Sequence, residues 1–238
     1  MDCGLMWDAR KKNDIRESED EGAYWRCTLI EVQTRLRVGR GIAQNETEAA
    51  MSLWRRVKQV TGMTMPPPLV SDGWGGHREA LVEVFGQVPI YSGQGRPPRK
   101  KQPQADWLYL QMVKQRENGR VMDTQARLIY GTVEQAEALL DYHTAYVERT
   151  NLTSRHMNGR LVRKTLGFSK RLEMLRAASV WEDVVYNFAR PVKTLRIEVN
   201  DGQRRWMPRS PAMVAGLTDR IWTMQDLLWS VPTPTNRL

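Results

Sequence analysis

The spacing of hydrophobic and polar positions predicts a hairpin followed by a helix near the start of the chain. Two β-rich runs, at 23–32 and 36–43, are separated by a short polar break, as in a β-hairpin. Residues 46–61 then place apolar side chains at helical spacing. Asn45 or Thr47 can cap that helix, and Gly62 can end it.

A strand that ends in an aspartate is predicted next. Three consecutive prolines exclude a helix, and the apolar pair Leu69-Val70 leads directly into Ser71-Asp72-Gly73. Helical spacing returns over 75–85, and a further strand is predicted over 88–91. The segment therefore reads as strand, tight turn, helix and strand.

Beyond residue 91 the pattern becomes mainly helical. In chain order the segments predict a basic, Gly- and Pro-rich loop (92–104), strands (107–116 and 127–130), a long helical tract (132–178) broken near Asn151, Gly159 and Gly167, a helix (180–188) and a last helix (217–229). A β-rich beginning, a mixed middle and a helical end favour an α/β fold over an all-β or all-α fold.

The charge balance predicts an anionic partner. The 238 residues include 36 Lys and Arg against 27 Asp and Glu, a net charge of +9, which suits nucleic acid or an acidic membrane surface. Cys3 and Cys27 are too few for a disulfide framework and lack zinc-ligand spacing, which favours a reducing compartment. Because no apolar run approaches the roughly 20 residues of a spanning helix, we expect a soluble cytoplasmic protein.

Asp72 is the first candidate for chemistry. A carboxylate at the end of a buried strand, followed by glycines that allow close approach, suits a divalent metal, since Mg²⁺ prefers one or two carboxylates together with water and phosphate oxygens. The alternative is that Asp72 caps the next helix or makes an Asx turn. His77, His143 and His156 lack metal-ligand spacing and are expected to be surface or packing residues.

Glu148 is the second candidate, because of the basic residues that follow it. Between residues 149 and 176 there are eight basic residues and one acid, in what the pattern predicts to be a helical stretch. An acid at the edge of such a surface could hold metal against a phosphodiester while its neighbours neutralise the backbone. The alternative is an ordinary ion pair on a solvated helix face.

Three blocks together resemble the catalytic region of bacterial transposases of the insertion sequence one family. The resemblance runs from about residue 23 to 228, and a tail, SPAMVAGLTDRIW at 210–222, is also similar to many members. The blocks are VSDGW at 70–74, VER at 147–149 with Arg155 and NGRLVRKTLGFSK at 158–170, and YNFARP at 186–191 with TLR at 194–196.

The resemblance implies an RNase H-like domain over residues 23–196, a mixed sheet flanked by helices, with a helical C-terminal extension over 197–238. It implies three acids around two Mg²⁺ or Mn²⁺ ions, with Asp72 as the second aspartate and Glu148 as the glutamate, for DNA strand cleavage and strand transfer in transposition. DNA is then the partner, with no membrane, and a homo-oligomer is expected on DNA in the bacterial cytoplasm and nucleoid. The residues expected to hold DNA are Arg149, Arg155, Arg160, Arg163, Lys164 and Lys170.

The first aspartate is where the chain departs from the family. Members place Asp-Glu, an apolar residue and Trp on the first strand, whereas this chain has Gly4 and Leu5 at the acidic positions before Met6-Trp7. Asp2 and Asp8 are nearby, but neighbouring strand positions alternate faces. Residues 1–22 therefore read as a polar arm or a truncated first strand. The family's N-terminal zinc-binding and helix-turn-helix region is also absent, and an overlapping upstream frame could encode it.

Two alternatives stay open. The missing aspartate favours a non-catalytic DNA-binding remnant or regulator of a transposable element, which keeps the basic surface without the metal site. An RNA-binding or membrane-surface protein would explain the charge but none of the three blocks.

Overall fold

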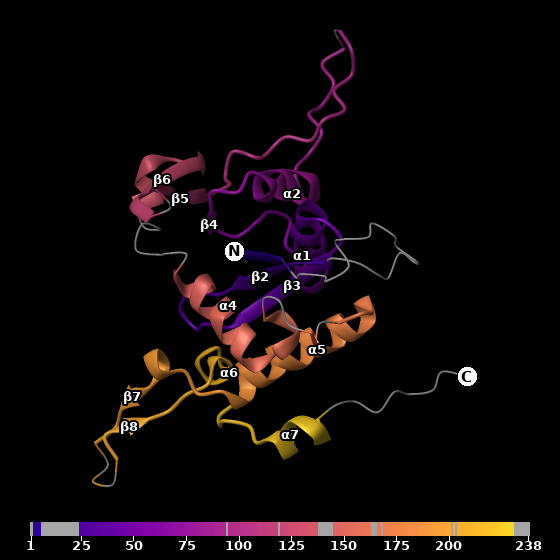
Figure 1. The fold of residues 1–238 in the computed structure, drawn as a ribbon. Coiled ribbons are helices and arrows are strands. Elements are labelled where there is room, and N and C mark those ends of the chain that lie inside the picture. The colour runs from indigo at the N-terminus through magenta and orange to yellow at the C-terminus, as the bar shows by residue number, and fades with distance from the viewer. Residues whose placement is uncertain are drawn as a thin grey trace. The chain divides into compact units, whose positions relative to one another are not determined.

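The computed structural model (Figure 1) divides the chain into two compact units, Met1–Ile30 with Val38–Phe168, and Glu31–Arg37 with Ser169–Leu238. The catalytic domain expected over 23–196 stays a prediction, since compactness does not test a functional boundary. The structure describes residues 24–93, 95–118, 120–137, 145–162, 166–167, 169–200, 202 and 204–230, and the backbone alone of residues 2–5.

The first sheet is a three-stranded antiparallel meander. Its order is β1 (Asp2–Leu5), β2 (Trp25–Ile30) and β3 (Arg37–Ala43), so the hairpin predicted from the β-rich runs is confirmed. β1 pairs with β2 in antiparallel register and lies at an edge of the described sheet. Residues 1–22 were predicted to be a polar arm or a truncated first strand, and the structure shows a four-residue strand there. The rest of that segment lies outside the described residues.

The first long helix, α1 (Glu46–Thr61), has the predicted bounds. The Asn45 side chain accepts a hydrogen bond from the Glu48 N–H at 2.8 Å, and Gly62, with φ of 69°, donates its own N–H to the Lys58 carbonyl at 2.9 Å. The buried side chains of α1 enter the core of the first unit: they are Ala49, Ala50, Leu53, Trp54 and Val57. Both ends and the buried face therefore follow from local sequence.

The second sheet is mixed and carries Asp72. β4 (Leu69–Asp72) pairs in parallel with β5 (Tyr109–Glu117), which pairs in antiparallel register with β6 (Arg120–Tyr130). The connection from β4 to β5 contains α2 (Gly76–Phe85). Because the central strand β5 is buried on both faces over 109–112, its sequence there shows no alternation between apolar and polar residues.

The predicted strand over 88–91 is wrong. Only Gln87 makes a ladder contact, an isolated bridge to Gln102, and the following residues have no regular structure. The side chain of Ile90 is 97% exposed, so this apolar stretch has no sheet face to cover. The loop predicted over 92–104 is otherwise confirmed in its described part.

The expected long helical tract is several short helices. They are α3 (Val133–Glu137), α4 (Ala145–Met157), a 3₁₀ turn (Gly159–Leu161) and α5 (Leu172–Val184). The break predicted near Asn151 is wrong, because Asn151 is buried inside α4. Interruptions at Gly159 and Gly167 are confirmed. α4 packs against β1 and β2.

The second unit is built on α5. Its last turn widens into a π-helical turn (Val185–Ala189), so residues 180–188 are helical as predicted, but they continue α5 and do not form a separate helix. A short hairpin of β7 (Ile197–Glu198) and β8 (Trp206–Met207) follows, then α6 (Pro211–Val214). The helix predicted over 217–229 begins only at Met224 in α7 (Met224–Trp229), because Thr223 and Asp226 form a capping box there.

A buried ion pair fixes the core of the second unit. Arg37 is fully buried, and its guanidinium lies 2.6 Å from the Glu182 carboxylate and 3.2 Å from that of Asp183. The same guanidinium stacks 3.9 Å from the Tyr186 ring centroid. The Arg37 N–H donates to Asn187 Oδ1 at 3.0 Å, and Asn187 Nδ2 donates to the Arg37 carbonyl at 3.1 Å. The π-helical turn thus presents both Tyr186 and Asn187 to one arginine.

The mixed α/β class is confirmed, although the described ladders form two three-stranded sheets and a two-stranded one rather than a single mixed sheet. No helix in the described ranges is both long and apolar enough to span a bilayer. Cys27 is disulfide-bonded, and Cys3 stands opposite it in the backbone register of β1 and β2. The prediction of a reducing compartment assumed that the two cysteines form no disulfide. Because Cys27 is bonded, cysteine usage does not support that compartment, and the cytoplasmic location stays a prediction.

Candidate functional site

Asp72 lies at the carboxyl end of β4, where the chain turns toward α2. Its Oδ1 accepts a hydrogen bond from the Trp74 N–H at 3.2 Å, which makes the Asx turn considered as the alternative to a metal ligand. It does not cap α2, whose N-cap position is Gly75, without a side-chain hydrogen bond. The carboxylate is therefore oriented by the turn and remains partly exposed.

The buried His77 is the neighbour of Asp72 that sequence reasoning missed. Its Nε2 lies 3.3 Å from Asp72 Oδ1, and its ring meets the edge of Trp74 with 4.8 Å between centroids. Burial raises the pKa of Asp72, but the hydrogen bond and charge of His77 and the Trp74 N–H outweigh it and hold that pKa below the usual 3.8. The expectation that His77 is a packing residue describes its burial but not this contact.

A buried polar network supports the turn that carries Asp72. The Ser71 and Tyr109 hydroxyls lie 2.7 Å apart, and Gln111 Nε2 donates to the Tyr109 hydroxyl at 2.8 Å and to the Trp74 carbonyl at 3.1 Å. Arg127 donates to Gln111 Oε1 at 2.6 Å. Burial raises the pKa of Tyr109, so the phenol stays protonated as a donor. This network links β4, β5 and β6 directly beneath the turn.

Glu148 lies in the first turn of α4 and forms an ion pair with Lys114 of β5. Lys114 is two residues, about 7 Å, beyond Met112, the register partner of Asp72. Residues two apart on a strand share a face, so Asp72, at the carboxyl end of β4, and Lys114, within the second half of β5, project from the same face of two parallel strands. Open α/β sheets bind ligands at the carboxyl ends of their parallel strands, and Asp72 lies at such an end. Lys114 pairs with Glu148 on the sheet face from which Asp72 projects.

The described residues do not supply a third acid for the expected pair of metal ions. Two carboxylates with water and substrate oxygens suffice for a single Mg²⁺. The expected pair of ions needs a further acid, and among the described residues no group of three or more His, Cys, Asp or Glu side chains could hold a metal. The side chains of Asp2 and Asp8, the sequence candidates for the missing aspartate, lie outside the described part.

The basic stretch after Glu148 is not one helical surface. Arg149 and Arg155 are exposed on α4, while Arg160 is half-buried in the following 3₁₀ turn. The helix ends at Met157 because the Asn158 side chain accepts the Arg160 N–H and starts that turn. Lys170 belongs to the second unit, and Arg163 and Lys164 lie outside the described residues. The structure thus places Arg149 and Arg155 on the helix of Glu148, and the stretch expected to be one helix is interrupted after Met157.

Comparison with protein-family models, with curated proteins and with solved structures finds no match. The functional argument therefore stands on the residues and their geometry.

Proposed function

We propose that this chain is a DNA-processing domain of the DDE transposase type, with an RNase H-like fold, in which Asp72 and Glu148 hold a catalytic metal. The observation that carries the proposal is the placement of these acids. They are 76 positions apart in the sequence, and Glu148 pairs with a lysine that projects from the same face of the sheet as Asp72. Net charge alone does not require that placement.

The arrangement of β1 and α4 adds support. α4, which carries Glu148, packs against β1, the strand whose family counterpart bears the first aspartate. The order of three antiparallel strands, a helix, a strand, a helix and a parallel strand suits an RNase H-like domain.

Within this proposal the side chains have distinct tasks. Asp72 and Glu148 would hold Mg²⁺ or Mn²⁺, which when bound activates an attacking hydroxyl and stabilises the leaving oxygen at phosphorus. The His77 contact lowers the pKa of Asp72 further below its ordinary value, so the carboxylate is in the ionised form that metal binding requires. Lys114 neutralises Glu148 until a cation takes its place. Arg149 and Arg155, exposed on α4, would hold the DNA backbone, and Arg160, Arg163, Lys164 and Lys170 are proposed for the same task.

A second function is a non-catalytic DNA-binding protein derived from such a transposase. The observation that favours it is that each acid already has a cationic or hydrogen-bonding neighbour, His77 for Asp72 and Lys114 for Glu148. Within the described ranges, no third acid completes the group. Such a protein would retain the basic surface and regulate or occupy element ends.

Metal-dependent nicking of supercoiled plasmid DNA separates these functions. We expect Asp72→Asn and Glu148→Gln each to abolish nicking in Mg²⁺ or Mn²⁺ while salt-sensitive DNA binding persists. Glu83→Gln is the matched control, since Glu83 is an exposed glutamate paired with Lys101 at 2.9 Å, much as Glu148 is paired with Lys114. Equal nicking by the parent and the two site variants rejects the metal assignment. Binding without nicking by the parent supports the non-catalytic function.

A further inference from the structure

The β7–β8 hairpin of the second unit is a firmly anchored basic ribbon. At its base the Val192 N–H donates to the Arg209 carbonyl at 3.0 Å, and Arg209 Nε donates to the Leu195 carbonyl at 2.7 Å. Above the two-residue ladder, the Val199 N–H donates to the Arg205 carbonyl at 3.0 Å. The backbone geometry of the arm is therefore held up to the turn.

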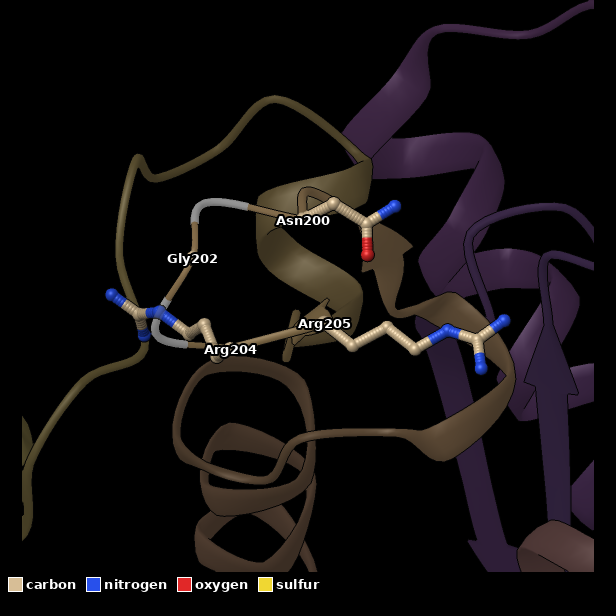
Figure 2. A pocket seen from close by; sticks show the side chains of 4 residues that line it. All are labelled: Asn200, Gly202, Arg204 and Arg205. Atoms are coloured by element: carbon tan, nitrogen blue, oxygen red, sulfur yellow. The ribbon is translucent and has the colours of Figure 1, made fainter.

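The tip of the hairpin is hollowed. Asn200 and Gly202 turn the chain with positive φ values of 45° and 82°. A concavity of about 300 Å³ is lined by Asn200, Gly202, Arg204 and Arg205 (Figure 2). In Figure 2 the side chains of Asn200 and Arg205 extend in one direction and that of Arg204 extends in the other. The tip thus carries two guanidinium groups that point away from each other.

An aromatic ring organises two of the arginines. The guanidinium carbons of Arg196 and Arg205 lie 4.1 and 5.5 Å from the centroid of the Trp206 ring, within the range of cation–π attraction. Arg205 also donates its Nε to Glu198 at 2.9 Å, while its side chain is 70% exposed. Stacking and this hydrogen bond limit the freedom of the side chain and leave the outer fork of the guanidinium toward solvent.

The hairpin carries a net positive charge. Residues 193–209 contain five basic residues and two acids. The basic residues are Lys193, Arg196, Arg204, Arg205 and Arg209. A Lys/Arg excess on a short exposed arm favours binding to a polyanion.

We propose that the β7–β8 hairpin is a second DNA-binding element, a ribbon that enters a groove of duplex DNA and contacts phosphates on both sides of it. The major groove, about 12 Å wide, admits a two-stranded β-ribbon. Arginines that point away from each other on such a ribbon reach the two backbones that border the groove, and the guanidinium fork matches phosphate oxygens in pairs. The inference rests on the proposed DNA binding but involves none of the residues assigned to the acidic site.

DNA titrations at several salt concentrations test the hairpin directly. Binding of a fluorescently labelled duplex is followed by anisotropy for the parent and for Arg204→Gln/Arg205→Gln. Each phosphate that the protein no longer neutralises lowers the slope of log affinity against log salt by about 0.9, so the double variant is expected to have a slope smaller by nearly two and to bind at least about tenfold more weakly. Far-UV circular dichroism and the Tm are expected to match the parent, since both side chains are exposed.

Arg220→Gln is the matched control. Arg220 is also an exposed arginine of the second unit, paired with Asp226 at 2.9 Å as Arg205 is with Glu198, and its replacement is expected to leave the slope unchanged. A double variant with the slope of the parent overturns the hairpin proposal while DNA binding by the chain stands. Loss of binding to anionic lipid vesicles with unchanged DNA binding overturns it in favour of a membrane surface. A parent that binds no duplex overturns both this inference and the proposed function.

Discussion

Removing the buried charge of Arg37 is expected to destabilise the second unit strongly. In Arg37→Met the aliphatic stem is kept, but Glu182, whose side chain is 3% exposed, loses the guanidinium that lies 2.6 Å from its carboxylate. An uncompensated buried charge costs about 3–5 kcal/mol. The stacking on Tyr186 is removed as well, while the two backbone hydrogen bonds with Asn187 remain possible.

The two acids around Arg37 are expected to contribute differently to the free energy of unfolding. Glu182→Gln leaves the guanidinium with Asp183 and with an amide oxygen, so a cost of about 1–3 kcal/mol is expected. Asp183→Asn should cost less than about 1 kcal/mol, because this carboxylate is 20% exposed and 3.2 Å from the guanidinium. The predicted order of destabilisation is therefore Arg37→Met, then Glu182→Gln, then Asp183→Asn.

Urea unfolding at pH 7, followed by far-UV circular dichroism and tryptophan fluorescence, measures these costs. Because the total stability of a domain is about 5–15 kcal/mol, Arg37→Met could leave the second unit unfolded. The double variant Arg37→Met/Glu182→Met keeps the test decisive, since it removes both charges and is expected to be more stable than Arg37→Met alone. Additive costs in the double variant, or a cost below about 1 kcal/mol for Arg37→Met, would refute the buried ion pair.

Two further predictions concern the first unit. Because the folded pKa of Asp72 lies below its unfolded value of 3.8, the ionised carboxylate stabilises the fold above that pH, and this contribution is lost as the pH falls through the folded pKa. Asp72→Asn should therefore flatten the acid part of a plot of unfolding free energy against pH. An unchanged acid part would contradict the His77 contact. Gly41→Ala should destabilise α1 packing by at least about 1–3 kcal/mol in urea unfolding, since an added Cβ would lie 1.8 Å from the Ala49 carbonyl oxygen, whereas Gly75→Ala, with open space around it, is the control.

Local signals were enough to predict the elements whose limits are set by their own residues. α1 begins at an asparagine cap and ends at a glycine in the left-handed region, and both are visible in the sequence. The strand that ends at Asp72 is bounded by prolines and followed by glycines, which limits where it can lie. Both the place of Asp72 at the end of this strand and its Asx turn could therefore be predicted from the sequence. The aspartate was the candidate metal ligand, and the turn was the alternative.

The failures occur where the wider structure decides. Ile90 and its neighbours have β-prone composition but pair with no strand in the described part of the chain, so the segment stays irregular. Asn151 favours a helix end by intrinsic preference, yet burial within α4 overrides it. Val185 continues α5 into a π-helical turn because Tyr186 and Asn187 are held by Arg37, a residue about 150 positions earlier in the chain.

The partners of the candidate acids illustrate the same limit and bear on function. Asp72 could be singled out from the sequence. His77 lies only five residues away, but the sequence does not show that the two side chains are in contact, because the contact depends on the turn that folds the helix back onto the strand end. Lys114 carried no signal at all, because a lysine in a strand usually faces solvent. Its position two residues beyond the register partner of Asp72 places its ion pair with Glu148 on the same face of the sheet as Asp72. Under the proposed function that lysine has to yield Glu148 to a metal ion, which is a competition between two cations for one carboxylate.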